Sequence, residues 1–317
     1  MAKITMQKDD KIDFLWDKYI LECRLNGYSE DTIRNKEHYF SIFYRFLGAE
    51  KRARNLSKDV CVSFLQARLK EGIKEVSINS STTVINTFLH WLYEYKYISE
   101  DLKIPKLKTQ EVAKETYTDE DLKVLLEKPD TIYFAEFRTW VIINYILATG
   151  NRLSSLLNIR NSDVYLSEGY LNLAHTKNKK KQIVPLSSSL CMILQEYMSI
   201  RQGEKEDYLF CSVYGKQLSR KGAGDALDRY CKARNINSLG HHAFRHTFAK
   251  ISVRDCHIDA FRLQKLMGHS DIKTTEHYVN LYSGDLLNDR DTYNPLEHLL
   301  KENNSSTERI AMKKKKR

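Results

Sequence analysis

Apolar residues recur at helical spacing through the first hundred residues, and polar breaks divide them into four segments. The first covers residues 10–26, and Ser29 is a candidate N-cap for the second, which stops at Gly48. Ser57 precedes the third segment in the same way, and the fourth ends at Tyr95. Because no stretch here alternates between apolar and polar residues, the pattern predicts a small bundle of four helices.

The helical periodicity lapses over residues 99–116, where lysines recur and Pro105 forbids a helix interior. We interpret this stretch as a linker between two domains, with an ordinary loop inside one domain as the alternative. The predicted order is a bundle (1–104), a linker (105–117), a second domain (118–292), and a C-terminal helix with a basic, disordered tail (293–317).

The second domain is predicted to be mixed but mostly helical. Thr118, with Asp121 three residues later, forms an approximate capping box for its first helix. Residues 137–147 are the most apolar segment and should form a core helix. Residues 170–173 and 182–186 read as two strands on either side of a lysine-rich turn. The fold class is therefore mainly α with a small β-sheet.

Composition limits the partners and the compartment. Lysine and arginine outnumber aspartate and glutamate by 51 to 41, and the net charge of +10 favours nucleic acid as partner, with an anionic membrane surface second. The six scattered cysteines contain no CxxC pair, which argues against a disulfide framework or a zinc site. Without an apolar span of about 18 residues or an apolar N-terminal core, we expect a cytoplasmic protein with no membrane partner.

Two segments of the second domain carry residues suited to phosphate chemistry. In the first, His242 and Arg245 are three apart on a predicted helix, where an imidazole and a guanidinium can bind a phosphate and move a proton. The alternative without a function is a structural histidine whose hydrogen bonds are made within the protein, beside a surface arginine. In the second, Gly268 is placed to end a helix in the left-handed conformation, with His269 just beyond it and Tyr278 on the next helix. Ser270 and Asp271 are both candidate caps of that helix.

These segments read HxxRH and GHxxxxTTxxY, and in this order they resemble the signatures of the tyrosine recombinase (phage integrase) family, compact two-domain type. Arg152 follows a Thr-Gly turn and Lys177 precedes a Val-Pro-Leu strand, as in that family. The resemblance spans roughly residues 10–290. It implies that the N-terminal bundle is the family's core-binding (SAM-like) DNA-binding domain and that the second domain is catalytic.

The resemblance also implies a mechanism. A tyrosine attacks the DNA phosphate and forms a 3′-phosphotyrosine, two arginines clamp the phosphate, a lysine protonates the leaving oxygen, one histidine moves the tyrosine proton, and another donates to the phosphate. The residues at these positions are, in that order, Tyr278, Arg152 and Arg245, Lys177, His242 and His269. No cofactor and no metal ion is needed.

Two positions near these residues need comment. The hairpin turn carries further lysines, so Lys179 remains an alternative general acid, and phosphate contacts along the DNA are expected of Lys179, Lys180 and Lys181. Ser155 stands where the family usually has an acidic residue, three positions after Arg152. Another group must therefore support that arginine.

As partners, the resemblance implies double-stranded DNA with a specific recombination site, a homotetramer on two such sites, and a possible accessory directionality factor. The helix expected at residues 294–300 docks either on a neighbouring protomer or on its own domain. Integration, excision or transposition of a mobile element and resolution of DNA molecules all remain open. The rival functions are relaxation like that of a type IB topoisomerase, a catalytically idle DNA-binding relative, and, more weakly, a telomere resolvase.

Overall fold

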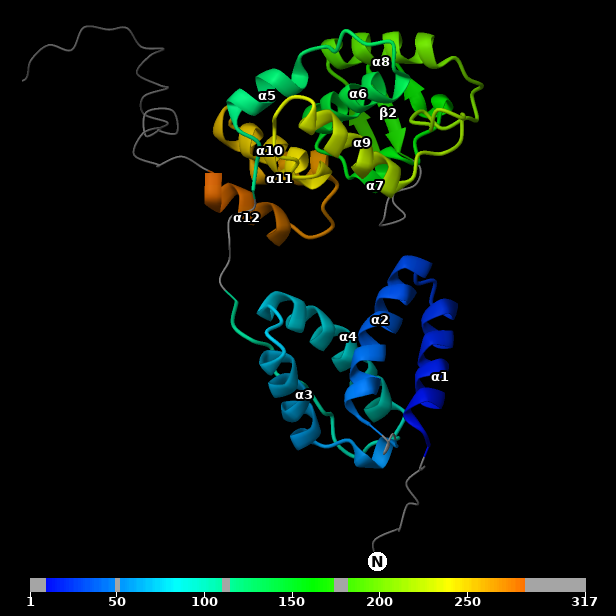
Figure 1. Ribbon diagram of the computed structural model, residues 1–317, viewed down its shortest axis with the longest axis vertical. Coiled ribbons are helices and arrows are strands. Elements are labelled where there is room, and N and C mark those ends of the chain that lie inside the picture. The colour runs from blue at the N-terminus through cyan, green and yellow to red at the C-terminus, as the bar shows by residue number, and fades with distance from the viewer. Residues whose placement is uncertain (1–9, 49–51, 110–114, 174–181, 283–317) are drawn as a thin grey trace, which may run out of the picture. The chain divides into compact units, whose positions relative to one another are not determined.

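The computed structural model describes residues 10–48, 52–109, 115–173 and 182–282, which fall into two compact units, Met1–Val112 and Ala113–Arg317 (Figure 1). No helix in these ranges is long and apolar enough to cross a membrane. All six cysteines lie within them and are free thiols.

The described part of the first unit is a four-helix bundle with one 3-10 turn (Figure 1). Its elements are α1 (Ile12–Leu25), α2 (Glu30–Phe46), η1 (Ala53–Asn55), α3 (Lys58–Lys70) and α4 (Glu75–Glu94). The predicted caps are confirmed, since Ser29 accepts a hydrogen bond from the Thr32 amide and Ser57 from the Val60 amide, each at 3.3 Å. Helix α2 packs against α4, and their apolar faces enclose the core.

Aromatic rings fill much of that core. Trp16 stacks on Phe40 at 3.9 Å between ring centroids and meets Phe88 edge-on at 5.0 Å. The chain after α4 continues this packing. Two asparagines of α4 hold it, because the Asn86 and Asn79 side chains each exchange two hydrogen bonds, of 2.8–3.0 Å, with the backbone of Ile104 and Leu107. Residues 104–107, expected at the linker, therefore lie against the bundle.

The second unit contains, in its described part, eight helices, one 3-10 turn and a small sheet. Its elements are α5 (Asp119–Leu126), α6 (Phe134–Thr149), α7 (Leu153–Leu156), η2 (Asn161–Asp163), β1 (Val164–Tyr165), β2 (Tyr170–Leu173), β3 (Gln182–Pro185), α8 (Ser188–Arg201), α9 (Arg220–Lys232), α10 (His241–Arg254), α11 (Ala260–Met267) and α12 (Lys273–Tyr282). The capping box of Thr118 and Asp121 is present, as predicted. The two expected strands pair antiparallel, with Leu171 opposite Val184, and the short β1 adds a third strand that the sequence pattern did not reveal.

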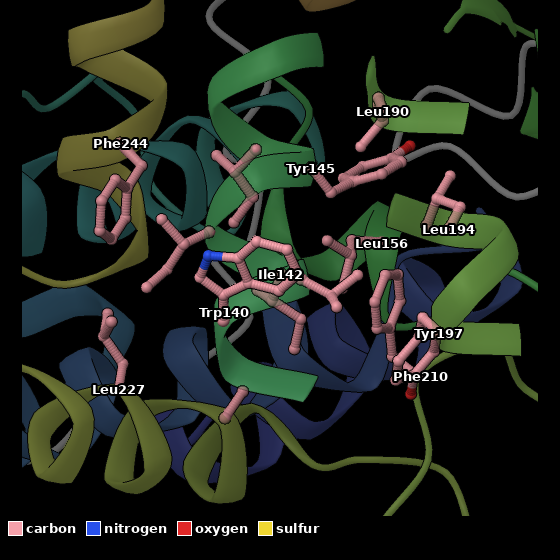
Figure 2. Close-up of a cluster of buried hydrophobic side chains, with 14 of the residues drawn as sticks. Trp140, Ile142, Tyr145, Leu156, Leu190, Leu194, Tyr197, Phe210, Leu227 and Phe244 are labelled. Atoms are coloured by element: carbon pink, nitrogen blue, oxygen red, sulfur yellow. The ribbon is translucent and has the colours of Figure 1, made fainter. Parts of the chain in front are cut away.

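Helix α6 is the centre of this unit, packed by α5, α8, α9 and α10 (Figure 1). It corresponds to the predicted core helix and is buried on every side, so its apolar residues show no amphipathic stripe. Figure 2 shows its side chains among those of its neighbours, with Tyr197 of α8, Leu227 of α9 and Phe244 of α10 around Trp140 and Ile142. Each such fully buried side chain contributes about 1.5–3 kcal/mol relative to its exposed state. The C-terminal ends of α6 and α11 meet α10 beside this core.

Candidate active site

Arg245 lies at the centre of the polar cluster. It sits in the second turn of α10, and only 4% of its surface is exposed. Its Nη1 donates to the Gly150 carbonyl, and its Nη2 donates to the Met267 carbonyl at 3.0 Å. A single guanidinium thus joins the ends of α6 and α11 to α10. Arg245 is therefore buried, which excludes the alternative of a surface arginine.

Arg152 approaches the same place from the turn after α6. Its Nη1 donates to the Gly268 carbonyl at 3.1 Å. The turn is built on Gly150, whose φ of +64° is left-handed and whose position leaves no room for a side chain, because an added Cβ would lie 2.3 Å from the Phe248 ring. Asn151 is buried beside it and donates to the Tyr145 hydroxyl at 3.0 Å. The packing of this turn fixes the backbone position from which the Arg152 side chain projects.

The turn between α11 and α12 presents His269. Gly268 ends α11 in the left-handed conformation with φ of +62°, as predicted. Gln182 of β3 packs beneath this turn, donating to the Lys265 and Leu266 carbonyls at 3.1 and 3.0 Å. His269 is 9% exposed. Of the two candidate caps for α12, Asp271 is the one whose carboxylate accepts the Lys273 amide, at 3.0 Å.

Tyr278 is buried in α12, with 3% of its surface exposed. Its hydroxyl lies 2.5 Å from Nδ1 of His246, a residue of α10. Its ring is nearly parallel to that of His269, with 6.3 Å between centroids. Phe248, Leu263 and Met267 surround it, so α10, α11 and α12 form one small core around the tyrosine.

His246 is the residue that the sequence interpretation missed. His242 was expected to exchange the tyrosine proton, but His242 is exposed and its ring centroid is 6.5 Å from that of His246. The hydrogen bond to the Tyr278 hydroxyl comes from the histidine one turn further along α10. His246 was visible as the last letter of HxxRH, and only the position of α12 decides which of the two histidines meets the tyrosine.

The two arginines form a strongly positive site. In the part of the chain that the structure describes, no carboxylate forms an ion pair with either guanidinium. Burial lowers the pKa of Arg245 to about 9, and the like charge of Arg152 adds to the effect. Burial also lowers the pKa of Arg152. Two desolvated cations without a counter-ion favour the binding of an anion, and a phosphate matches their bidentate geometry.

A second buried histidine lies at the start of the same helix. His241 is 8% exposed, and its Nε2 has no hydrogen-bond partner among the described residues. Burial lowers its pKa to about 4, so the ring is neutral near neutral pH. Among the described residues, no group of three or more His, Cys, Asp or Glu side chains is arranged to hold a metal ion.

The sequence model of the phage integrase family matches residues 115–284, which is more than half of the chain and includes all the site residues described above. The chain belongs to the phage integrase family, the tyrosine recombinases.

Similar proteins agree with this membership. The tyrosine recombinase XerD of Halalkalibacterium halodurans is 28% identical over 270 residues, covering 80% of this chain and 88% of that protein. The integrase of transposon Tn1549, solved with transposon right-end DNA, superposes with a TM-score of 0.71 at 16% identity, covering 92% of this chain and all of the other. A lambda integrase tetramer on a Holliday junction gives 0.68 at 17% identity, covering 86% and 78%. These two structures support the fold.

The structure describes the surroundings of Ser155 but not the lysines of the hairpin turn or the expected C-terminal helix. Lys177, with Lys179, Lys180 and Lys181, lies outside the described residues, as does the helix expected at residues 294–300. Ser155, which replaces an expected acid, is buried in α7, and its amide donates to the Arg152 carbonyl at 3.0 Å. The guanidinium of Arg152 is held instead by the Gly268 carbonyl. A backbone oxygen therefore supports this arginine without neutralising its charge.

Proposed function

We propose that this tyrosine recombinase breaks and rejoins DNA strands at a specific site through a covalent 3′-phosphotyrosine on Tyr278. The observation that carries the proposal is the hydrogen bond of the Tyr278 hydroxyl to His246, made beside Arg152, Arg245 and His269. A nucleophile, a proton acceptor and unpaired cations for the phosphate oxygens are the groups that this reaction requires.

The cleavage step assigns each group a task. The Tyr278 oxygen attacks phosphorus as His246 takes its proton, and the bond to the leaving O5′ breaks as Lys177 supplies a proton to that oxygen. The products are a 3′-phosphotyrosine and a free 5′-hydroxyl. Arg152 and Arg245 stabilise the charge on the non-bridging oxygens, because a guanidinium has five N–H donors and the carbonyl bonds use only some of them. His242 lies at the exposed end of this group, where it can contact the DNA.

Rejoining is the same reaction in reverse. A 5′-hydroxyl attacks the phosphotyrosine, and the bond to Tyr278 breaks, so the energy of the phosphodiester is conserved and no cofactor is consumed.

We propose strand exchange between two DNA sites within a homotetramer as the biological reaction, with the bundle as a second DNA-binding unit. The lambda integrase tetramer supports this assembly through its similar fold. The net charge of +10 supports a polyanionic partner. Integration, excision, transposition and resolution all use this chemistry, and an accessory directionality factor stays a prediction.

The test is covalent trapping on a nicked suicide duplex. The duplex carries the sequence that the full chain selects from a random DNA library. Wild type should give a protein–DNA adduct that survives denaturation, and Tyr278→Phe should bind the duplex and give none. Tight binding without an adduct in wild type would support a non-catalytic DNA-binding relative. Adducts with relaxation, but without products in a two-site assay, would support topoisomerase-like activity.

A further inference from the structure

A buried threonine connects the helix of the nucleophile to His269. Thr275 lies in the first turn of α12 with none of its surface exposed, and its Oγ1 is 2.8 Å from Nδ1 of His269. Tyr278 follows on the same helix three residues later, so the two side chains project from neighbouring turns. The hydrogen bond therefore forms only when α12 lies against the turn that carries His269.

The surroundings of Thr275 indicate which group donates. Three threonines inside other helices, Thr139, Thr149 and Thr247, donate to the carbonyl four residues earlier at 2.7–2.8 Å. Thr275 lies too near the start of α12 to follow them. Among the residues whose placement is described, Nδ1 of His269 is the one hydrogen-bond partner of its hydroxyl. A buried hydroxyl uses its proton where an acceptor is present, so we assign the Thr275 hydroxyl as the donor and Nδ1 as the acceptor.

The direction of this bond sets the tautomer of His269. When Nδ1 of a neutral imidazole accepts, the ring proton is on Nε2. An Nε2–H is a hydrogen-bond donor and is suited to a phosphate oxygen, whereas the opposite tautomer would present a lone pair to that oxygen and repel it. A histidine that serves the phosphate therefore needs a partner on Nδ1 that donates.

We propose that Thr275 is a positioning residue that fixes the Nε2–H tautomer of His269 and so prepares a hydrogen-bond donor for the scissile phosphate. The inference rests on the proposed function and extends it, because the donor is formed together with the placement of the helix that bears Tyr278. A displaced α12 would remove the nucleophile and release the tautomer of His269 in one movement.

The backbone of His269 is held separately from its ring. Its amide donates to the Gln264 carbonyl at 3.1 Å, and its carbonyl accepts from the Gln264 side chain at 3.2 Å. A change at Thr275 therefore acts on the ring while the turn stays in place. Thr275→Val removes the hydroxyl with little change of shape, and Thr275→Ser retains it. Thr274→Val is the matched control, because Thr274 is the exposed neighbour on the same helix.

The tautomer can be read without DNA by long-range ¹H–¹⁵N NMR of the full chain labelled on histidine. Spectra at pH about 8.5 lie well above the ordinary imidazole pKa of about 6.5, and His269→Gln identifies the resonance. We expect the Nε2–H pattern in wild type, Thr275→Ser and Thr274→Val, and a shift toward the other tautomer in Thr275→Val. An Nδ1–H pattern in wild type, or no change in Thr275→Val, overturns the proposal.

A kinetic measurement on the suicide duplex gives the consequence for catalysis. Thr275→Val should slow adduct formation about tenfold, the effect of losing one neutral hydrogen bond, while Thr275→Ser and Thr274→Val stay within about twofold of wild type. An equal loss in Thr275→Ser would indicate a packing role and would reject the proposal. Absence of any wild-type adduct would instead count against the proposed function, and the NMR result would separate the two failures.

Discussion

Lys36 of the first unit and Arg245 of the second are both buried cations, and they are bound in different ways. In the bundle, Lys36 of α2 is 7% exposed and donates to the Tyr19 hydroxyl at 2.6 Å and the Thr87 hydroxyl at 3.4 Å. Its ammonium also lies 4.9 Å from the centroid of the Tyr19 ring. In the second unit, Arg245 donates to two backbone carbonyls, and Arg152 is close enough to depress its pKa.

This difference distinguishes a buried charge that the fold only tolerates, Lys36, from one that is suited to a function, Arg245. The hydrogen-bond partners of Lys36 are two neutral hydroxyls, those of Tyr19 and Thr87. These hydroxyls also form a hydrogen bond with each other at 3.0 Å. Arg245 joins three segments of the chain and lies beside a second cation, an arrangement that costs stability until an anion binds. Burial of charge alone is therefore no sign of a site. The more informative observation is that two like charges repel each other and that no carboxylate among the described residues pairs with them.

The largest expected effect is on cleavage. Arg245→Lys should lower the rate of adduct formation by about a thousandfold or more, because a bidentate donor at the phosphate is lost. The matched control is Arg138→Lys, at an equally buried arginine outside the site. The Arg138 guanidinium donates to the Cys211 carbonyl at 2.5 Å. Single-turnover trapping per folded molecule measures both. Similar rates for the two variants would contradict the role of Arg245.

Substitution of one left-handed glycine in each unit tests how tightly the backbone is packed there. Gly150→Ala should destabilise the protein by about 2–5 kcal/mol, since it adds backbone strain and a clash with Phe248. Gly72→Ala in the bundle has a similar φ of +71° but open space around the new Cβ, so about 1–2 kcal/mol is expected. Denaturant unfolding of the full chain measures both. A larger cost at Gly72 would show that the turn before Arg152 is not tightly packed.

Acid should weaken the second unit through His241. Its folded pKa of about 4 is below the unfolded value, so the unfolded chain binds more protons in between. The stability is fully present above pH about 6.5 and is lost as the pH falls through about 4, by up to about 3 kcal/mol. Thermal unfolding of His241→Asn should show a smaller loss over this window. His38→Asn, at an exposed histidine of the bundle, should behave as wild type.

The smallest effect is expected at Lys36. Lys36→Met removes a buried charge while keeping a side chain of similar length, and Tyr19 and Thr87 still satisfy each other. The free energy of unfolding should therefore change by less than about 1 kcal/mol, or rise. A loss of several kcal/mol in urea unfolding would mean that the ammonium stabilises the bundle, and the contrast with Arg245 would then fail.

Local signals in the sequence predicted most of the fold. The caps at Ser29, Ser57 and Thr118 depend on nearest neighbours along the chain, and each is confirmed. The left-handed turn at Gly268 has the same local origin. The two-residue strand β1 was missed because it carries too few residues to show alternation.

The sequence named residues that the structure brings together, but it did not predict their contacts. The hydrogen bond of His246 to Tyr278 depends on how α12 packs on α10, and residues 32 apart carry no local signal of meeting. The attachment of Ile104 and Leu107 to α4 was missed for the same reason, because it is made by single asparagines. The carbonyl of Gly268 that holds Arg152 is a backbone atom, and residue identity says nothing of it.

The most direct test of Tyr278 as nucleophile is to locate the covalent bond itself. Wild-type protein trapped on the suicide duplex is digested with nuclease and protease, and the peptide that retains a nucleotide is sequenced by mass spectrometry. We expect the modified peptide to contain residues 274–282, with the phosphate on Tyr278 and a free 5′-hydroxyl on the released strand. A phosphate on another tyrosine, or linkage to a 5′ end, would contradict the assignment of the site.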